Sequence, residues 1–253
     1  MSSTEPPRKD APLVEVVNDE ASFTEAYKCV SAAFGTQVHD AIWEAFNPGW
    51  DTAAGQAAGA ARMVRRWQGT TRNKDGERNT VFLKATLPGP DGRNRVTAGF
   101  AIWVQISAVE GHGDTALGAL GDEVMQSLYP DNEKEQRFLK QMFDSLFKAR
   151  VAFVRGTVSK ADPPAVMALD LCATHPDFQR RGVASSLVRW GMEETRRRGI
   201  RYATIEASAM GRLAYATLGF KPQGGDFVYE VDDEFADRGK PPNVFMVWDR
   251  QDE

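Results

Sequence analysis

The 253-residue chain carries a formal net charge of −4, and 42% of its residues are hydrophobic, which is enough for one sizeable core. The acidic balance argues against a general nucleic-acid binder, which usually presents a basic face. No apolar run reaches the ~18 residues of a membrane span, and the polar start lacks the apolar segment of a secretory signal. We therefore expect a soluble, cytoplasmic protein without nucleic-acid or membrane partners.

The first part of the chain predicts a tail, a strand and three helices. Residues 1–12 are polar and rich in proline, which predicts a disordered tail ahead of a single domain over residues 13–253. Residues 13–17 alternate apolar and charged side chains, as a half-exposed strand does. Apolar residues at helical spacing then mark three segments, 23–34, 39–46 and 51–68.

The middle of the chain predicts a hairpin and a long insertion. Two strands, 79–87 and 95–106, are joined by a turn rich in proline and glycine at residues 88–92. In the insertion, residues 107–165, an apolar stripe at i, i+3 and i+4 starts after residue 131: Phe138, Leu139, Met142, Phe143, Leu146 and Phe147. We expect an amphipathic helix that covers the sheet, forms a lid over a site or makes a dimer contact.

The last part predicts a strand, a helix, a strand, a short helix and an antiparallel pair of strands. These elements fall at residues 165–173, 183–198, 202–207, 212–218, 227–231 and 243–248. Cys172 lies in the first of these strands, far along the chain from Cys29. This arrangement argues against a disulfide framework and favours a reducing compartment.

The stretch between the strand at 165–173 and the following helix has the chemistry of an anion site. Pro176 ends the strand, and Gly182 with small residues after it leaves the backbone N–H groups of the helix start uncovered. The positive end of the helix dipole and two arginines, Arg180 and Arg181, favour a phosphate or pyrophosphate. A nucleotide-binding P-loop does not fit, because no lysine follows the glycine.

Two motifs resemble the GCN5-related N-acetyltransferase (GNAT) superfamily. Gln179, Gly182 and Ala184 match the family's loop for the pyrophosphate of an acyl-CoA, and Tyr215, Gly219 and Phe220 match its Tyr-x-x-x-Gly-Phe ending. The resemblance implies an α/β (α+β) fold with a mixed, mostly antiparallel sheet of six to seven strands. In that fold strands four and five are parallel and splayed, and helices lie on both faces, here with a helical insertion between strands three and four.

The resemblance also implies where acetyl-CoA, as cosubstrate, and the acceptor bind. The pantetheine arm would pair with the fourth strand, and the pyrophosphate with the loop. The implied donor-binding residues are Leu171, Cys172, Ala173, Gln179, Arg180, Arg181, Gly182, Val183, Ala184, Ser185 and, as a polar contact, Ser208. The region between strands one and two lines the acceptor site in the family, which makes Trp43, Phe46 and Trp50 candidate substrate contacts, unless they are core residues.

Tyr215 matches the family's tyrosine near the sulfur of CoA, and it would protonate the leaving thiolate, unless it is a structural residue. For the general base, Glu206 is the leading candidate because it ends a strand near the predicted cleft and burial would raise its pKa. His175 is a weaker candidate and is expected to cap the turn. His39 and His112 lack the spacing of metal ligands, so no metal is expected.

We therefore expect an N-acetyltransferase that transfers the acetyl group to a small primary amine by direct attack on the thioester, as a monomer or homodimer. Two alternatives stay open: an acetyltransferase for protein lysines or N-termini, and a regulatory module that binds CoA without turnover.

Overall fold

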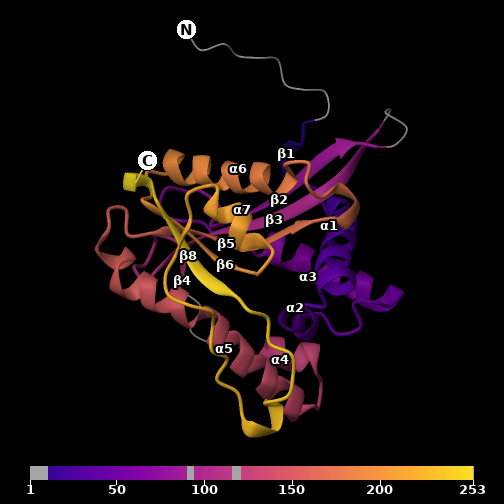
Figure 1. Ribbon diagram of the computed structural model, residues 1–253. Helices are drawn as coiled ribbons and strands as arrows, with labels where there is room; N and C mark the ends of the chain where they lie inside the picture. Colours follow the sequence, from indigo (N-terminus) through magenta and orange to yellow (C-terminus); the bar gives the residue numbers. More distant parts are fainter. Residues whose placement is uncertain (1–10, 90–93, 116–120, 253) are drawn as a thin grey trace.

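The computed structural model describes residues 11–89, 94–115 and 121–252, which contain a single mixed sheet with helices packed on it (Figure 1). The strands follow the order β1-β2-β3-β5-β6-β8-β7, and β4 pairs with the end of β3. Their bounds are β1 (Leu13–Val16), β2 (Thr80–Pro88), β3 (Arg95–Ser107), β4 (Asp114–Thr115), β5 (Val166–Thr174), β6 (Tyr202–Ala207), β7 (Lys221–Pro222) and β8 (Val244–Asp249).

The helices are α1 (Ser22–Val30), α2 (Ala41–Phe46), α3 (Ala53–Gln68), α4 (Asp122–Leu128), α5 (Glu133–Gly156), α6 (Val183–Arg197) and α7 (Gly211–Ala216). A π-helix, Ser31–Val38, continues α1. The predicted helices over residues 39–46 and 51–68 are confirmed as α2 and α3. None of the helices in the described ranges is both long and apolar enough to span a membrane.

Helices cover both faces of the sheet because its inner strands are apolar on both sides (Figure 1). In β2, Leu83 and Leu87 point into the core under α6, whereas Phe82 points to the opposite face. The face with Phe82 packs against α1, α3 and the end of α5. On the other face, α6 packs closely against β3, since a Cβ at Gly191 of α6 would lie 2.0 Å from a ring atom of Trp103.

The parallel pair β5–β6 is splayed, as the resemblance implied. The two strands pair only from Val166 with Tyr202 to Leu169 with Ile205, although β5 continues to Thr174 and β6 to Ala207. On its other edge β5 remains paired with β3 as far as Thr174. The last residues of β5 therefore have backbone groups that face the gap between the two strands.

The insertion contains the predicted amphipathic helix. Asn132 caps α5, because its side chain accepts the N–H of Glu135 at 3.2 Å. The first half of α5 packs against residues 227–235, where Phe138 contacts Phe235, and its second half packs onto the sheet through Val154. The helix thus covers part of the sheet and part of the polar connection that precedes β8.

One strand prediction was wrong. Residues 227–231 contain no strand, and β8 pairs instead with β6 and with the two-residue β7. The reason is tertiary: Phe227 and Tyr229 pack toward the cluster on α5, while Val228 between them is 79% exposed. The short strands β4 and β7 also bring the sheet to eight strands rather than six or seven.

Two predictions fall wholly or partly outside the described residues. The tail over residues 1–12 lies almost entirely in the undescribed range 1–10. Part of the turn at 88–92 lies in a second undescribed range, 90–93. The hairpin itself is confirmed, because β2 and β3 pair antiparallel up to Pro88 and Arg95.

Candidate active site

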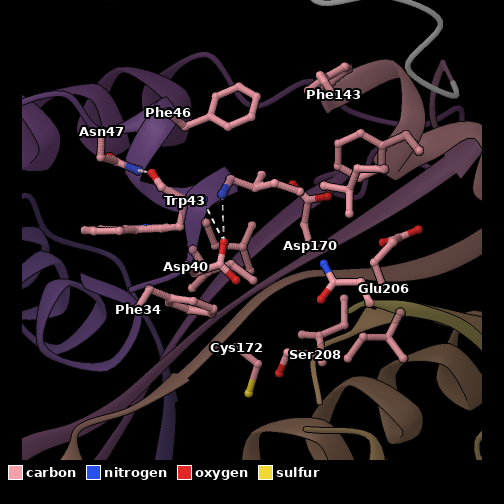
Figure 2. A pocket seen from close by; sticks show the side chains of 18 of the residues that line it. Phe34, Asp40, Trp43, Phe46, Asn47, Phe143, Asp170, Cys172, Glu206 and Ser208 are labelled. Carbon is pink, nitrogen blue, oxygen red and sulfur yellow. Dashed lines mark hydrogen bonds between the residues drawn. The ribbon is translucent and has the colours of Figure 1, made fainter. Parts of the chain in front are cut away.

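A cavity of about 340 Å³ lies where the splayed strands meet the helices of the opposite face (Figure 2). Its wall is built by α2, α3, α5, the π-helix and the ends of β5 and β6, with Tyr215 of α7. In the view of Figure 2, Cys172 and Ser208 lie at one end and Phe46 and Phe143 at the other, with Asp40, Asp170 and Glu206 between them. The cavity therefore connects the splayed strands with an aromatic wall.

The aromatic wall includes two of the three predicted substrate contacts, Trp43 and Phe46. Trp43 stacks on Phe34 with ring centroids 6.2 Å apart, and Phe46 lies 5.7 Å from Phe143 of α5. Trp50 does not line the cavity; it packs edge-on against Trp43, 5.7 Å away. The insertion helix thus supplies part of this wall in addition to covering the sheet.

A buried ionic network crosses one wall of the cavity. Arg150 of α5, with a side chain only 1% exposed, donates from Nε to Glu206 at 2.9 Å and from Nη1 to Asp170 at 2.8 Å. Its Nη2 donates to the second oxygen of Glu206. Arg66 of α3 donates to the other oxygen of Asp170 at 2.6 Å. Two guanidinium groups thus neutralise two carboxylates.

This pairing gives the two carboxylates different acidities. Although burial opposes ionisation, Arg66 and Arg150 hold the pKa of Asp170 well below its usual range. Burial raises the pKa of Glu206, and the contacts with Arg150 offset it only in part. Glu206 lines the cavity as expected, but both of its oxygens accept from Arg150. Its role as a base stays a prediction.

A third carboxylate, Asp40, was missed by the sequence analysis. It precedes α2, and its Oδ1 accepts the N–H groups of Ile42 and Trp43 at 3.1 and 2.9 Å. Burial raises its pKa despite these two bonds. The only signal in the sequence is that aspartate is a favoured helix cap, which says nothing of a cavity.

The end of the cavity with Cys172 contains the splayed part of β5. Leu171 and Cys172 line the cavity, whereas Ala173 is buried and pairs with Phe100 of β3. Among the described residues, no β6 partner pairs with these three positions. Their free edge can therefore accept an added extended segment, as the pantetheine arm requires.

Tyr215 lies beside the sulfur of Cys172 and is 7% exposed. Burial and Cys172 hold the pKa of the phenol well above its ordinary value, and burial raises the pKa of the Cys172 thiol to about 12. The phenol is therefore protonated at neutral pH and can donate a proton. Ser208 lines the cavity near it, and its hydroxyl accepts the N–H of Gly211 at 3.2 Å.

The loop before α6 has the conformation expected of an anion site. Arg180 and Gly182 adopt left-handed backbone angles, with φ of 62° and 79°. The first helical bond is donated by Ser186 to Gly182, so the amides of Val183, Ala184 and Ser185 belong to the uncovered helix start. The side chain of Val183 is buried in the core, which leaves only its backbone for a ligand.

Neighbouring residues hold this loop in place. Gln179 and Gln37 of the π-helix exchange two side-chain hydrogen bonds of 2.7 and 3.2 Å, and Arg181 stacks over Phe178 at 5.8 Å. His175 caps the turn as predicted, since its Nδ1 accepts the N–H of Asp177. In the described part of the chain, no group of three His, Cys, Asp or Glu side chains is arranged to hold a metal ion.

Comparison with known proteins agrees with the fold described above. The model of the acetyltransferase (GNAT) family matches residues 120–220, and no curated protein sequence matches the chain significantly. An agmatine N-acetyltransferase in its apo form shares 12% identity, with a TM-score of 0.56 and coverage of 94% of this chain and 98% of that one. Arylalkylamine N-acetyltransferase 2 from Aedes aegypti shares 14%, with the same TM-score and coverage.

A protein described as histone acetyltransferase HPA2 and related acetyltransferase, from Corynebacterium glutamicum, shares 18% identity over 94% of this chain and 95% of that one, with a TM-score of 0.51. The named acceptors of these proteins differ, so the likeness concerns the fold. The resemblance to the GNAT superfamily is confirmed: residues 120–220 match the family, and the sheet and helices have the fold of GNAT acetyltransferases.

Proposed function

We propose that the protein transfers the acetyl group of acetyl-CoA to a primary amine of a small molecule by direct attack on the thioester. The observation that carries this proposal is the splay of β5 and β6 beside a cavity of about 340 Å³, with an anion-binding loop directly after β5. Donor site and acceptor cavity meet at Cys172 and Tyr215.

For the donor, the free edge of Leu171, Cys172 and Ala173 would hold the pantetheine arm through backbone hydrogen bonds. The uncovered amides of residues 182–185 and the charges of Arg180 and Arg181 would hold the pyrophosphate. Gln179 keeps the loop against the π-helix through Gln37. These residues fix the thioester against the cavity, and such positioning is a main source of rate in a two-substrate transfer.

In the transfer step, the acceptor nitrogen, once its ammonium form has lost a proton, attacks the acetyl carbonyl carbon, and the bond between that carbon and sulfur breaks. Tyr215 is assigned as the donor of the proton that the leaving thiolate takes up. Glu206, the base favoured by the sequence, would take the proton of the amine through water. Because Arg150 engages both of its oxygens, a water must compete with that guanidinium for a lone pair.

A small-molecule acceptor is favoured over a polypeptide because helix α5 and residues 227–235 pack together over the cavity region. The aromatic rings of Trp43, Phe46 and Phe143 would contact the acceptor's apolar body. Agmatine and the arylalkylamines, acceptors given by the names of two proteins of like fold, are therefore the amines to screen first.

The first experiment is calorimetric titration of the purified chain with acetyl-CoA, alongside ATP and NAD. Micromolar binding of acetyl-CoA alone supports the donor assignment, and release of free thiol with an amine panel then tests transfer. Binding of a nucleotide without acetyl-CoA would contradict the proposal. Binding of acetyl-CoA without turnover on any amine or peptide would instead favour the regulatory CoA-binding module.

A further inference from the structure

Three carboxylates line the cavity, and they are not equally neutralised. Asp170 is paired with Arg66 and Arg150, and Glu206 is paired with Arg150. Asp40 has no ion pair with a basic side chain within residues 11–89, 94–115 and 121–252. It is therefore the one carboxylate of the lining that has no ion pair with a basic side chain of the described residues.

The geometry of Asp40 leaves half of its carboxylate for a ligand. The residue is 7% exposed, and Oδ1 is taken by the two backbone N–H groups at the start of α2. For Oδ2, the described residues provide no hydrogen-bond donor. Figure 2 shows the carboxylate between the aromatic side chains of Phe34 and Trp43 and the side chain of Asp170. A carboxylate oxygen in a cavity wall that has no protein donor is left for a ligand or a water molecule.

A second, independent observation lies at Asn243, which also lines the cavity. It is 7% exposed, and its Oδ1 has no donor in the described chain. The hydroxyl of Tyr229 also has no hydrogen-bond partner in the described chain. It lies beside Asn243, and the charge of Asp40 helps to raise its pKa. Residues from two distant segments thus place under-satisfied oxygens together: the amide oxygen of Asn243 lacks a donor, and the hydroxyl of Tyr229 lacks a partner.

We propose that Asp40 and Asn243, with Tyr229 beside them, form a subsite that binds the ammonium group of the acceptor. The inference rests on the proposed function and specifies its acceptor: a cationic primary amine on an aromatic or aliphatic body. An ammonium group carries three N–H donors, no acceptor and a positive charge, which matches oxygens that lack donors beside an uncompensated carboxylate. The rings of Phe34 and Trp43 contact the apolar part.

The basic residues of the lining do not oppose this assignment. Arg66 is engaged by Asp170, and Arg150 lies behind the wall between Asp170 and Glu206. Arg62 donates to the Oδ1 of Asn47 at 3.0 Å and lies near the hydroxyl of Tyr27. Each of these cations is thus turned to another partner.

The decisive variant is Asp40→Asn. Asparagine is also a favoured helix cap, so its Oδ1 keeps the bonds to Ile42 and Trp43 and the fold is preserved. The second oxygen becomes an NH₂ group, which cannot accept from an ammonium. The matched control is Asp19→Asn, because exposed Asp19 accepts the N–H of Ser22 at 2.8 Å before α1, away from the cavity.

The measurement is calorimetric titration of the full chain, saturated with CoA, with phenethylamine, agmatine and the neutral 2-phenylethanol. The parent should bind phenethylamine at least about tenfold more tightly than 2-phenylethanol. Asp40→Asn should weaken both amines about ten- to a hundredfold, as expected for the loss of a hydrogen bond to a charged group, and leave the alcohol unchanged. Asn243→Leu, with its fold checked by thermal melting, should weaken the amines several-fold.

The subsite is overturned if the parent binds neither amine, if it does not prefer phenethylamine to the alcohol, or if Asp40→Asn binds both amines as tightly as Asp19→Asn does. These results differ from failure of the proposed function. A chain that acetylates amines with no role for Asp40 loses only the subsite, whereas a chain that does not bind acetyl-CoA or CoA loses the transferase function itself.

Discussion

Replacing Arg150 by methionine should lower the free energy of unfolding by about 3 kcal/mol, at the lower end of the ~3–5 kcal/mol expected when one partner of a buried ion pair is removed. The side chain is 1% exposed and bonds to Glu206 and Asp170. Methionine fills most of the volume, so little of the loss comes from packing. Asp170 keeps Arg66, so of the two carboxylates that Arg150 bonds, only Glu206 loses its cation.

The pH dependence of this destabilisation tests whether the unpaired carboxylate of Glu206 causes it. Without Arg150, the pKa of Glu206 in the folded variant rises further above its ordinary value of 4.5, because burial then acts unopposed. The unfolded chain ionises above pH 4.5, whereas the folded variant resists ionisation, so stability falls as pH rises through this window. The destabilisation relative to the parent should therefore be smaller at pH 5 than at pH 7.

The assay is urea unfolding of parent and variant at both pH values. The matched control is Arg137→Met on the same helix. Exposed Arg137 pairs with Asp232 and Glu234, and its loss should change the free energy of unfolding little. If Arg150→Met costs less than about 1 kcal/mol at pH 7, as an exposed pair would, or if its cost does not change with pH, the reasoning on an uncompensated buried carboxylate is refuted.

Three further variants test the donor site and the packing beneath it. Gly182→Asp should weaken acetyl-CoA binding more than tenfold in calorimetry, because a carboxylate would face the pyrophosphate; Gly199→Asp, at a similar left-handed position past α6, controls for backbone strain and should bind normally. Tyr215→Phe should leave acetyl-CoA affinity near normal and lower kcat by about one to three orders of magnitude, the contribution of one proton donor; an unchanged kcat would make Tyr215 structural. Gly191→Ala should lower the unfolding free energy by about 1–3 kcal/mol in urea, since its Cβ would overlap Trp103, and a variant as stable as the parent would contradict that close packing.

Much of the candidate donor site could be predicted from the sequence because its elements are local. The turn at Pro176, the left-handed Gly182 and the start of α6 follow one another along the chain, and the proposed binding uses backbone groups. Tyr215 and Ser208 also lie near each other in sequence, on α7 and just before it. Apolar spacing likewise predicted α2, α3 and α5, since a helix buries side chains at fixed intervals.

The tertiary structure alone decided the rest, because those features join segments that are distant along the chain. Arg150 and Glu206 are 56 positions apart, and nothing in either sequence neighbourhood indicates that they pair. Residues 227–231 have the composition of a strand, but packing against α5 outweighs that preference. In the sequence, Asp40 has only the pattern of a helix cap. The fold places it in a cavity wall together with Asn243, which is about 200 positions away. Local pattern thus determined the elements and the loop before α6, whereas the charges that line the cavity depend on how the insertion and the last segment pack onto the sheet.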